Sequence, residues 1–313
     1  MKGTILDGHA LNPGDLDWSV LTDKGDFTIF EGTSPDEVLE RCSGCEVVIT
    51  NKVAFDRKVI EALPQLRYIG VTATGYNIID TQAAKEHGVA VTNIPAYSTN
   101  AVAQHVFAFL LELADGVGLH DASVKAGDWE RSASFCYWKR PLFELEGKRI
   151  GIVGAGNIGR RVASLARAFG MEVLYTSPHS RIEGARLVSF DELVASCPII
   201  SLHCPLSVDT LHMVDDEALG RMGEGTILIN CSRGPLVDSG AVLRALDSGR
   251  LSWYCADVLE VEPPRDDMLV HHPHTLITPH IAWAPLETRS RLLDIASDNL
   301  EAWLEGRQLN RIV

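Results

Sequence analysis

Three side chains in the last third of the chain could together exchange a proton with a small acid. They are Arg233, Glu262 and His280, and each directly follows an apolar run typical of a strand. An Arg guanidinium matches a carboxylate in two-point contact. A Glu beside a His raises the pKa of the imidazole, because the imidazolium gains an opposite charge. Such a His can give a proton in a reduction and take it back in an oxidation. The set predicts reduction of a 2-oxo acid, with Arg233 holding the carboxylate and polarising the ketone.

Each of these residues also has a simpler interpretation. Arg233 could cap a helix, and Glu262 could be a surface acid before Pro263. Their positions at successive strand ends of one sheet favour the chemical interpretation, because ligands gather at the carboxyl ends of parallel strands. A nearby cluster of His271, His272 and His274 could suggest a metal. It falls in a polar loop without Cys or a clear acidic partner, so we expect a solvated loop and no metal site.

A glycine fingerprint predicts a dinucleotide site. Gly154, Gly156 and Gly159, with Asn157 and Ile158 between them, follow an apolar strand and open an amphipathic helix. The first glycine permits a tight turn, the second lets the backbone approach a pyrophosphate, and the third lets the helix pack closely on the strand. The free N–H groups of the helix then face the anion. The alternative is a plain strand–helix–strand unit with glycines for packing.

The second strand of this unit normally ends in an acid that binds the ribose hydroxyls. Here that place falls on Thr176 or Ser177, and no carboxylate follows until Glu183. Without an acid at this place, a 2′-phosphate would not be repelled. The phosphate could also accept hydrogen bonds from Ser177, His179 and Arg181. The pattern favours NADP. The alternative is that Arg181 is a solvated cation and that the cofactor is NAD.

Strand-like apolar runs alternate with stretches of helical length along most of the chain. This alternation predicts an α/β protein with two doubly wound parallel-sheet (Rossmann-like) domains and a cleft between them. The expected strands are Gly3–Leu6, Glu46–Thr50, Arg67–Val71, Val89–Asn93, Arg149–Val153, Glu172–Thr176, Ile199–His203, Thr226–Asn230, Tyr254–Val258 and Thr275–Thr278.

The alternation breaks at a long apolar helix, expected from Thr99 to about His120, with a polar and aromatic loop after it. We expect this helix to link the domains. The substrate domain would comprise 1–98 and 286–313, and the dinucleotide-binding domain 99–285. A C-terminal helix, about Leu286–Leu304, should pack back on the first domain.

Composition limits the partners and the compartment. The 313 residues carry a net charge of −14, which disfavours nucleic acids and anionic membranes as partners. No apolar run approaches the ~20 residues of a membrane span, and the N-terminus is typical of a strand rather than a signal peptide. The odd number of Cys, seven, indicates a reducing cytoplasm. Cys42 and Cys45 could form a redox or metal pair, but a helix end at Gly44 is the favoured interpretation.

Over its whole length the chain resembles the D-isomer-specific 2-hydroxyacid dehydrogenase family. The resemblance rests on VTATGYNIID (71–80), VGAGNIG (153–159), HCPLSVDT (203–210), INCSRGPLVD (229–238), ADVLEVEPP (256–264) and TPHIAW (278–283). It implies catalytic roles for Arg233, Glu262 and His280, and contact of Asp257 with the nicotinamide amide. The further cofactor-lining positions that it implies are Cys204, Pro205, Thr210, Cys231, Ser232 and Ala282. The implied substrate-binding residues are Val53, Thr74, Gly75, Arg233, His280 and Trp138.

Within the family the chain is most similar to glycerate dehydrogenases, also called hydroxypyruvate reductases. The cues are TNKVAFD (50–56), NIPAYST (93–99) and FCYWKRPLFEL (135–145). The resemblance implies conversion of hydroxypyruvate or glyoxylate to D-glycerate or glycolate, and a homodimer formed through the dinucleotide-binding domain. Trp138 would either reach the active site of the partner subunit or anchor the dimer interface.

Three other functions compete with this one. Corepressors related to the family use the fold as a dinucleotide-sensing scaffold, but Arg233, Glu262 and His280 argue for catalysis. A D-lactate-type or other 2-oxoacid reductase would differ in side chains around residues 52–54, 74–76 and 283. Formate oxidation releases no hydroxyl proton, so it would leave the His–Glu pair unexplained.

Overall fold

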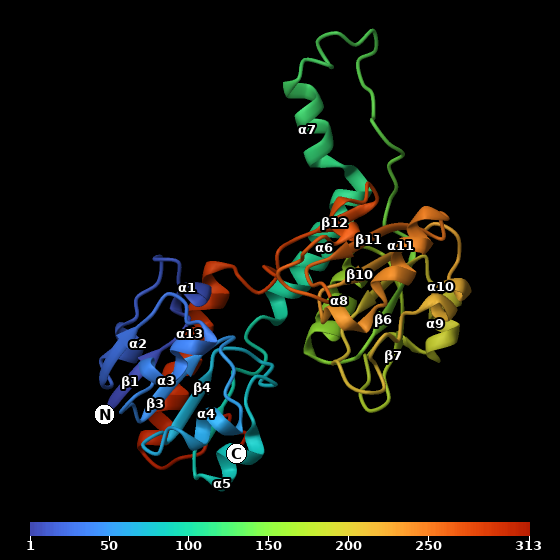
Figure 1. Cartoon of the computed structure of the whole chain (residues 1–313). Coiled ribbons are helices and arrows are strands. Elements are labelled where there is room, and N and C mark those ends of the chain that lie inside the picture. Colours follow the sequence, from blue (N-terminus) through green and yellow to red (C-terminus); the bar gives the residue numbers. More distant parts are fainter. The chain divides into compact units, whose positions relative to one another are not determined.

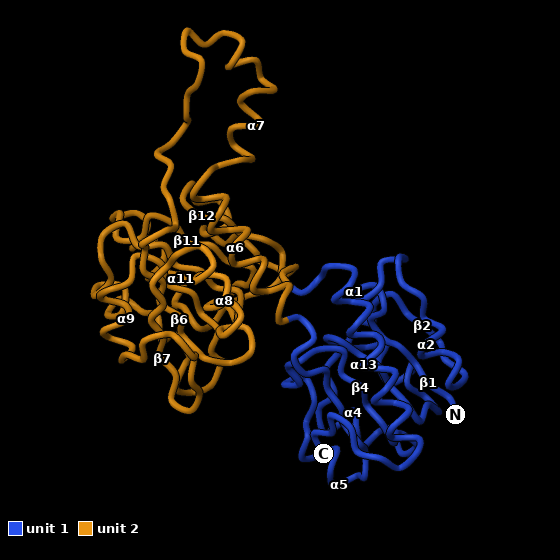
Figure 2. The backbone as a smooth tube through the Cα atoms, turned by 180° about the vertical axis from the view of Figure 1, so that it is seen from behind, with its two compact units in different colours: residues 1–98, 283–313 blue, residues 99–282 orange.

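The computed structural model describes residues 1–313 and divides into two compact units (Figure 2). Unit 1 is Met1–Ser98 with Trp283–Val313, and unit 2 is Thr99–Ala282. The chain returns to unit 1 at Trp283, before the boundary at residue 286 that the sequence suggested. The reason lies in Trp283 itself, whose partly buried ring packs against the core of unit 1, edge-on to Tyr97 with centroids 6.5 Å apart.

Unit 1 is built on five parallel strands in the order β2-β1-β3-β4-β5, the flavodoxin-like order. The strands are β1 (Lys2–Ile5), β2 (Asp26–Ile29), β3 (Val47–Thr50), β4 (Tyr68–Val71) and β5 (Ala90–Thr92). The helices are α1 (Gly8–Leu11), α2 (Ser19–Thr22), η1 (Pro35–Glu37), α3 (Val38–Arg41), α4 (Arg57–Glu61), α5 (Thr81–Glu86) and α13 (Leu286–Leu304).

Helix α13 covers one face of this sheet. Its Leu292 and Leu300 share a buried cluster with Val47 and Ile49 of β3, whereas Val48 belongs to the cluster on the opposite face. Alternate residues of a strand point to opposite faces, so both faces of the sheet are buried at β3, and β4 and β5 are likewise buried at every position. This is why the sequence shows apolar runs instead of alternation.

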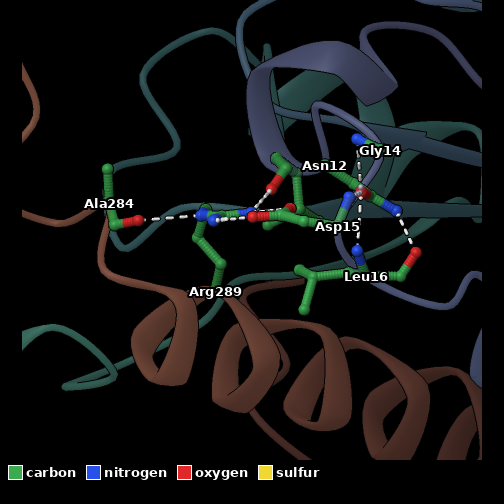
Figure 3. A network of polar contacts seen from close by, with 7 residues as sticks. Asn12, Gly14, Asp15, Leu16, Ala284 and Arg289 are labelled. Carbon is green, nitrogen blue, oxygen red and sulfur yellow. Dashed lines mark hydrogen bonds and ion pairs between the residues drawn. The ribbon is translucent and has the colours of Figure 1, made fainter.

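A polar network fixes the start of α13 within unit 1 (Figure 3). The Arg289 guanidinium donates two hydrogen bonds of 2.6 Å to the Asp15 carboxylate, and its Nε donates to the Ala284 carbonyl at 2.8 Å. Asn12 Oδ1 accepts the backbone N–H groups of residues 14–16. Arg289 lowers the pKa of Asp15, which keeps this pair charged.

Unit 2 is built on seven parallel strands in the order β12-β11-β10-β9-β6-β7-β8, which is the doubly wound 3-2-1-4-5-6 order with one strand added. The predicted class, two parallel-sheet α/β domains, is confirmed. The strands are β6 (Arg149–Val153), β7 (Glu172–Thr176), β8 (Arg186–Leu187), β9 (Ile199–Leu202), β10 (Thr226–Asn230), β11 (Leu251–Ala256) and β12 (Thr275–Ile277). The helices are α6 (Thr99–Asp115), α7 (Val117–Lys125), α8 (Asn157–Ala168), α9 (Phe190–Ser196), α10 (Asp216–Arg221), η2 (Gly234–Leu236), α11 (Ser239–Asp247) and α12 (Met268–His271).

The strand predictions differ from the structure in two ways. Strands β2 and β8 were not predicted, because both are edge strands with largely exposed side chains and no apolar run. Strand β11 begins at Leu251, before the expected Tyr254, since half-exposed Ser252 and Trp253 interrupt its apolar pattern.

The long helix predicted to continue to about His120 is two helices. Gly116 has a φ of 59°, which ends α6, and α7 continues at an angle of 54° to it. No single helix is both long enough and apolar enough to cross a membrane. Helices α6 and α7 meet the criteria of length and composition only when they are counted together as one bent pair. Nine residues of α6 are buried, so this helix belongs to the core of unit 2.

Beyond Gly116 the chain forms an arm, residues 117–140, that extends away from the rest of unit 2 (Figure 1). The arm is braced internally by Asp128, whose carboxylate accepts hydrogen bonds from Lys139 Nζ at 2.7 Å and Ser123 Oγ at 2.6 Å. At its base, Arg140 donates to the Glu112 carbonyl and lies 5.4 Å from the ring centroid of Trp253.

Candidate functional site

The glycine turn between β6 and α8 has the geometry of a phosphate cradle. A Cβ at Gly154, whose φ is 103°, would lie 2.6 Å from the backbone of His203, and one at Gly159 would lie 2.1 Å from the Gly154 carbonyl oxygen. No atom lies within 4 Å of the place a Gly156 Cβ would take. Gly156 is the N-cap of α8 and offers no capping side chain. The helix N-terminus therefore meets open space of the kind a pyrophosphate needs, and the residues fit a dinucleotide.

The end of β7 carries no acid. Thr176 ends the strand, and the Oγ of Ser177 accepts the Ser180 N–H at 3.3 Å in the turn that follows. Arg160, on α8, donates from Nε to the Arg181 carbonyl at 3.2 Å and ties this turn to the helix of the glycine fingerprint. The turn thus presents hydroxyl groups and exposed basic side chains instead of a carboxylate.

The loop after β9 is held to the loop after β10. Ser232 Oγ donates to the Cys204 carbonyl at 2.7 Å, and Thr210 Oγ1 donates to the Pro205 carbonyl at 2.8 Å. Burial raises the pKa of Cys204 to about 11 and that of Cys231 well above its usual value. Both cysteines are therefore neutral thiols that fill space, not nucleophiles.

The end of β10 shapes the turn that carries Arg233. Asn230 donates from Nδ2 to the Arg233 carbonyl at 2.9 Å and accepts the Ser232 N–H at 3.0 Å. The Arg233 side chain is exposed and donates to the Ser232 carbonyl at 2.7 Å. Asn230 was not predicted from the sequence, where its only signal is a polar residue at the end of an apolar strand.

Glu262 and His280 are in direct contact. His280 Nδ1 lies 2.6 Å from Glu262 Oε2, and the side chains are 30% and 36% exposed for His280 and Glu262. The other carboxylate oxygen, Oε1, accepts the Leu259 N–H at 2.9 Å. The carboxylate is thus oriented from both sides. It fixes the ring and selects the tautomer with hydrogen on Nδ1.

Asp257 supports the segment that carries His280. It is 2% exposed, and its carboxylate accepts Thr278 Oγ1 at 2.6 Å and the N–H groups of Ile281 and Ala282 at 2.8 Å. His105 of α6 completes the group, with Nε2 2.9 Å from Thr278 Oγ1. Burial lowers the pKa of His105 against the opposing effect of Asp257. His105 was not predicted from the sequence, where its only signal is a lone His in an apolar helix.

The residues expected to bind substrate fall in both units. Val53, Thr74 and Gly75 follow β3 and β4 of unit 1, whereas Arg233, His280 and Trp138 belong to unit 2. Asn93 Nδ2 donates to the Thr74 carbonyl at 2.7 Å, which fixes the loop after β4. Trp138 lies on the arm and is 64% exposed.

The sequence also suggested two other candidate sites, a cysteine pair and a histidine cluster. Cys42 and Cys45 are buried at the end of α3, and burial raises the pKa of Cys42 to about 12. His272 pairs with Asp247 at 3.5 Å, and His274 Nδ1 lies 3.1 Å from the Ser252 carbonyl. No group of three or more His, Cys, Asp or Glu side chains is placed to hold a metal ion.

Comparison with known proteins decides the family. The profile described as D-isomer specific 2-hydroxyacid dehydrogenase, NAD binding domain, matches residues 107–282. The chain belongs to this family. As a D-isomer-specific 2-hydroxyacid dehydrogenase it is an oxidoreductase that transfers a hydride between a nicotinamide dinucleotide and a small 2-hydroxy or 2-oxo acid.

Individual relatives of this dehydrogenase agree with the match. It is 43% identical to the hydroxypyruvate reductase of Blautia hydrogenotrophica over 99% of both chains, and 37% identical to the glycerate dehydrogenase of Methylorubrum extorquens over 91% of both. Among solved structures it is similar to an acyclic imino acid reductase (Bsp5) in complex with NADPH and D-Arg. That similarity has a TM-score of 0.88 and 29% identity over 100% of both chains.

Proposed function

We propose that this dehydrogenase reduces hydroxypyruvate to D-glycerate and glyoxylate to glycolate. The observation that carries the proposal is the 2.6 Å contact between His280 Nδ1 and Glu262 Oε2, at the carboxyl edge of the sheet that also bears the glycine turn. The similarity to a hydroxypyruvate reductase and a glycerate dehydrogenase supports this choice of acids.

In the proposed reaction His280 is the proton donor. With Nδ1–H directed to Glu262, Nε2 is the ring nitrogen that gives a proton to the oxygen on C2 of the substrate. The reduced nicotinamide, when bound, supplies the hydride to C2. His280 is then neutral, and it takes the proton back when the reaction runs towards oxidation. Glu262 orients the ring and stabilises the imidazolium.

Arg233 is proposed to hold the substrate carboxylate and polarise the ketone. The two hydrogen bonds of Asn230 fix the backbone at Ser232 and Arg233. The Arg233 guanidinium would therefore approach the substrate carboxylate from a defined direction. In a chain of net charge −14 an acidic substrate needs such a local cation. Val53, Thr74 and Gly75 of unit 1 are proposed to bind the same small acid.

We propose NADP as the preferred cofactor, with NAD as the alternative. The turn after β7 offers Ser177, His179 and Arg181 to a 2′-phosphate, and its first acid is Glu183. The exposed Arg160, whose Nε is bonded to the Arg181 carbonyl, adds a second positive charge beside the turn. Asp257 keeps its proposed contact with the nicotinamide amide, and the remaining predicted residues, including Ala282, keep their proposed places along the cofactor.

A second copy of the chain is the proposed partner of the arm. Val117, Trp129, Phe135 and Trp138 are between 52% and 88% exposed, more apolar surface than a free arm would carry. Docking two arms would bury it in a homodimer formed by the dinucleotide-binding unit. The cytoplasm is the proposed location, because all seven cysteines are free thiols.

A steady-state panel tests the proposed function. Hydroxypyruvate, glyoxylate, pyruvate and phenylpyruvate are each offered with NADH and with NADPH. We expect kcat/KM to be highest for hydroxypyruvate and glyoxylate, and higher with NADPH than with NADH. Preference for pyruvate would replace the proposal with a D-lactate-type reductase, and equal use of all four acids would remove the substrate assignment.

A further inference from the structure

Another histidine–carboxylate pair of unit 2 lies next to the proposed catalytic set. His212 Nε2 is 2.6 Å from Glu260 Oε1, and Glu260 precedes Glu262 in the loop after β11. The other oxygen of Glu260, Oε2, accepts the Ser239 N–H at 3.1 Å. One carboxylate therefore joins three segments: the turn at His212, the start of α11 and the loop that carries Glu262.

The backbone of His212 is fixed as firmly as its side chain. Its φ is 50°, a conformation uncommon for a residue other than glycine, which persists where the surroundings determine it. Its N–H donates to the Pro235 carbonyl at 2.8 Å, and the Val214 N–H donates to the Leu236 carbonyl at 3.1 Å. His212 is thus attached to the segment that directly follows Arg233.

The loops of Arg233 and Glu262 touch without intervening space. A Cβ on Gly234 would lie 1.9 Å from the carbonyl carbon of Leu259. The N–H of the same Leu259 holds Glu262 Oε1 at 2.9 Å. A shift of the loop at Glu260 would therefore displace the neighbour of Arg233 and the orientation of Glu262 together.

We infer that His212 and Glu260 form a positioning pair, which keeps the loops of Arg233 and Glu262 in the relation that oxo-acid reduction requires. This inference rests on the roles proposed above for those two residues. The His212 and Glu260 side chains are 43% and 28% exposed, so the attraction of their charges is weakened by solvent. The contribution is geometric: hydrogen bonds to a carboxylate are short and directional.

The test compares Glu260→Ala with Glu260→Gln and His212→Ala. Misplacement of a reacting group by about 1 Å costs up to ~10²-fold in rate, so we expect Glu260→Ala to lower kcat for hydroxypyruvate by about 10-fold or more. KM for hydroxypyruvate should rise as Arg233 becomes less well held, while the Kd of NADPH stays unchanged. Gln accepts the Ser239 N–H and can donate to neutral His212, so it should restore most of the loss.

Asp247→Ala is the matched control. It removes the carboxylate partner of another histidine of unit 2, His272, which lies beside the opposite end of β12 from His280. We expect no change in kcat or KM. A slower hydride transfer in Glu260→Ala should also appear as a larger primary isotope effect with deuterated NADPH, which a general loss of stability would not produce.

Several results would overturn the inference. One is a folded Glu260→Ala protein with unchanged kcat, KM and isotope effect; another is a Gln variant as slow as the Ala variant. If Glu260→Ala does not fold, His212→Ala must show the same fall in kcat and rise in KM. A His212→Ala protein without these changes would also overturn the inference.

His280→Ala separates the two proposals. If that variant keeps its turnover, the proposed function is wrong; if it loses turnover and Glu260→Ala does not, only the positioning pair is wrong.

Discussion

Two carboxylates close to the end of β11 have different environments. Asp257 is almost fully buried and accepts three hydrogen bonds, whereas Glu262 is partly exposed and shares its oxygens between Leu259 and His280. The buried acid holds the segment from Thr278 to Ala282, in addition to the nicotinamide contact proposed for it. The partly exposed acid can respond to a change of charge on His280. The difference in burial therefore suits only Glu262 to the proposed proton exchange.

His280→Ala is the sharpest test at the level of residues. Removing the general acid should lower kcat for hydroxypyruvate by about 10²–10⁴-fold. The Kd of NADPH should change little, because the glycine turn is untouched. The measurements are steady-state kinetics and a fluorescence titration of the cofactor. His274→Ala, which removes an exposed His at the other end of the same strand, should behave as the wild type. Unchanged turnover in His280→Ala would remove the assignment.

Asp257→Asn tests the supporting role of the buried acid. The amide nitrogen cannot accept the Ala282 N–H, and a buried donor left unsatisfied costs about 1–3 kcal/mol. We expect a loss of that size in the free energy of unfolding by urea, together with a lower kcat as His280 loses its fixed position. Thr278→Val, which removes the hydroxyl that contacts both Asp257 and His105, should cost about 1 kcal/mol. Equal stability of Asp257→Asn and the wild type would contradict this role.

At this scale the sequence predicts the residues for which chemical roles are proposed, and it misses residues that only hold the loops in place. Arg233, Glu262 and His280 were singled out because their types and strand-end positions are informative. Asn230 holds the backbone of its own turn, whereas the contacts of His105 and Glu260 join segments far apart in the chain. No local pattern encodes such contacts, so they could not be read from the sequence.

At the level of elements, the strand–helix unit β6–α8–β7 is proposed to govern cofactor choice. The pyrophosphate proposed to bind its glycine turn is common to NAD and NADP, so we expect the discrimination to fall on the turn after Thr176. The structure attaches that turn to α8 through Arg160. A substitution at Ser177 should therefore change the choice of cofactor without altering the fold.

Ser177→Asp should reverse or equalise the cofactor preference. The new carboxylate can accept the ribose hydroxyls of NADH and repels a 2′-phosphate, and like charges placed together cost several kcal/mol. We expect the ratio of kcat/KM with NADPH to that with NADH to fall by at least ~10-fold, which is about 1.4 kcal/mol. Ser177→Asn has the same shape without the charge and should leave the ratio near that of the wild type. An unaltered ratio in the Asp variant would place the 2′-site elsewhere.

The elements that the sequence predicted best are the buried parallel strands. Five-residue apolar runs such as Arg149–Val153 and Thr226–Asn230 are bounded as expected. Edge strand β2 was missed because exposed strands lose the apolar signal. The break at Gly116 was missed because a single Gly within an apolar helix is often tolerated, and only its positive φ marks the end of α6.

At the level of the whole molecule, the arm is expected to set the oligomeric state. The wild type should sediment at twice the 34.2 kDa of the chain. Phe135→Asp places a charge on the most exposed aromatic of the arm, 88% exposed, and should shift the protein towards monomers. Asp121→Asn, an exposed charge change on α7, is the control. A monomeric wild type would contradict the proposal.

Trp138→Ala separates the two roles proposed for that residue. If Trp138 reaches the active site of the partner subunit, KM for hydroxypyruvate should rise while the dimer persists. If it anchors the interface, the dimer should weaken first and activity should fall with dilution. Sedimentation and kinetics measured over the same range of protein concentration distinguish these outcomes.

The arm also carries Cys136, whose thiol is exposed, whereas the other six cysteines are buried. A maleimide or nitroxide reagent should therefore attach at a single position of the native protein without prior mutagenesis. Such a label would report the distance between two arms by pulsed electron spin resonance, and its mobility would show whether the arm tip is clamped or free. The natural distribution of thiols thus provides a spectroscopic probe at the place where assembly is proposed to occur.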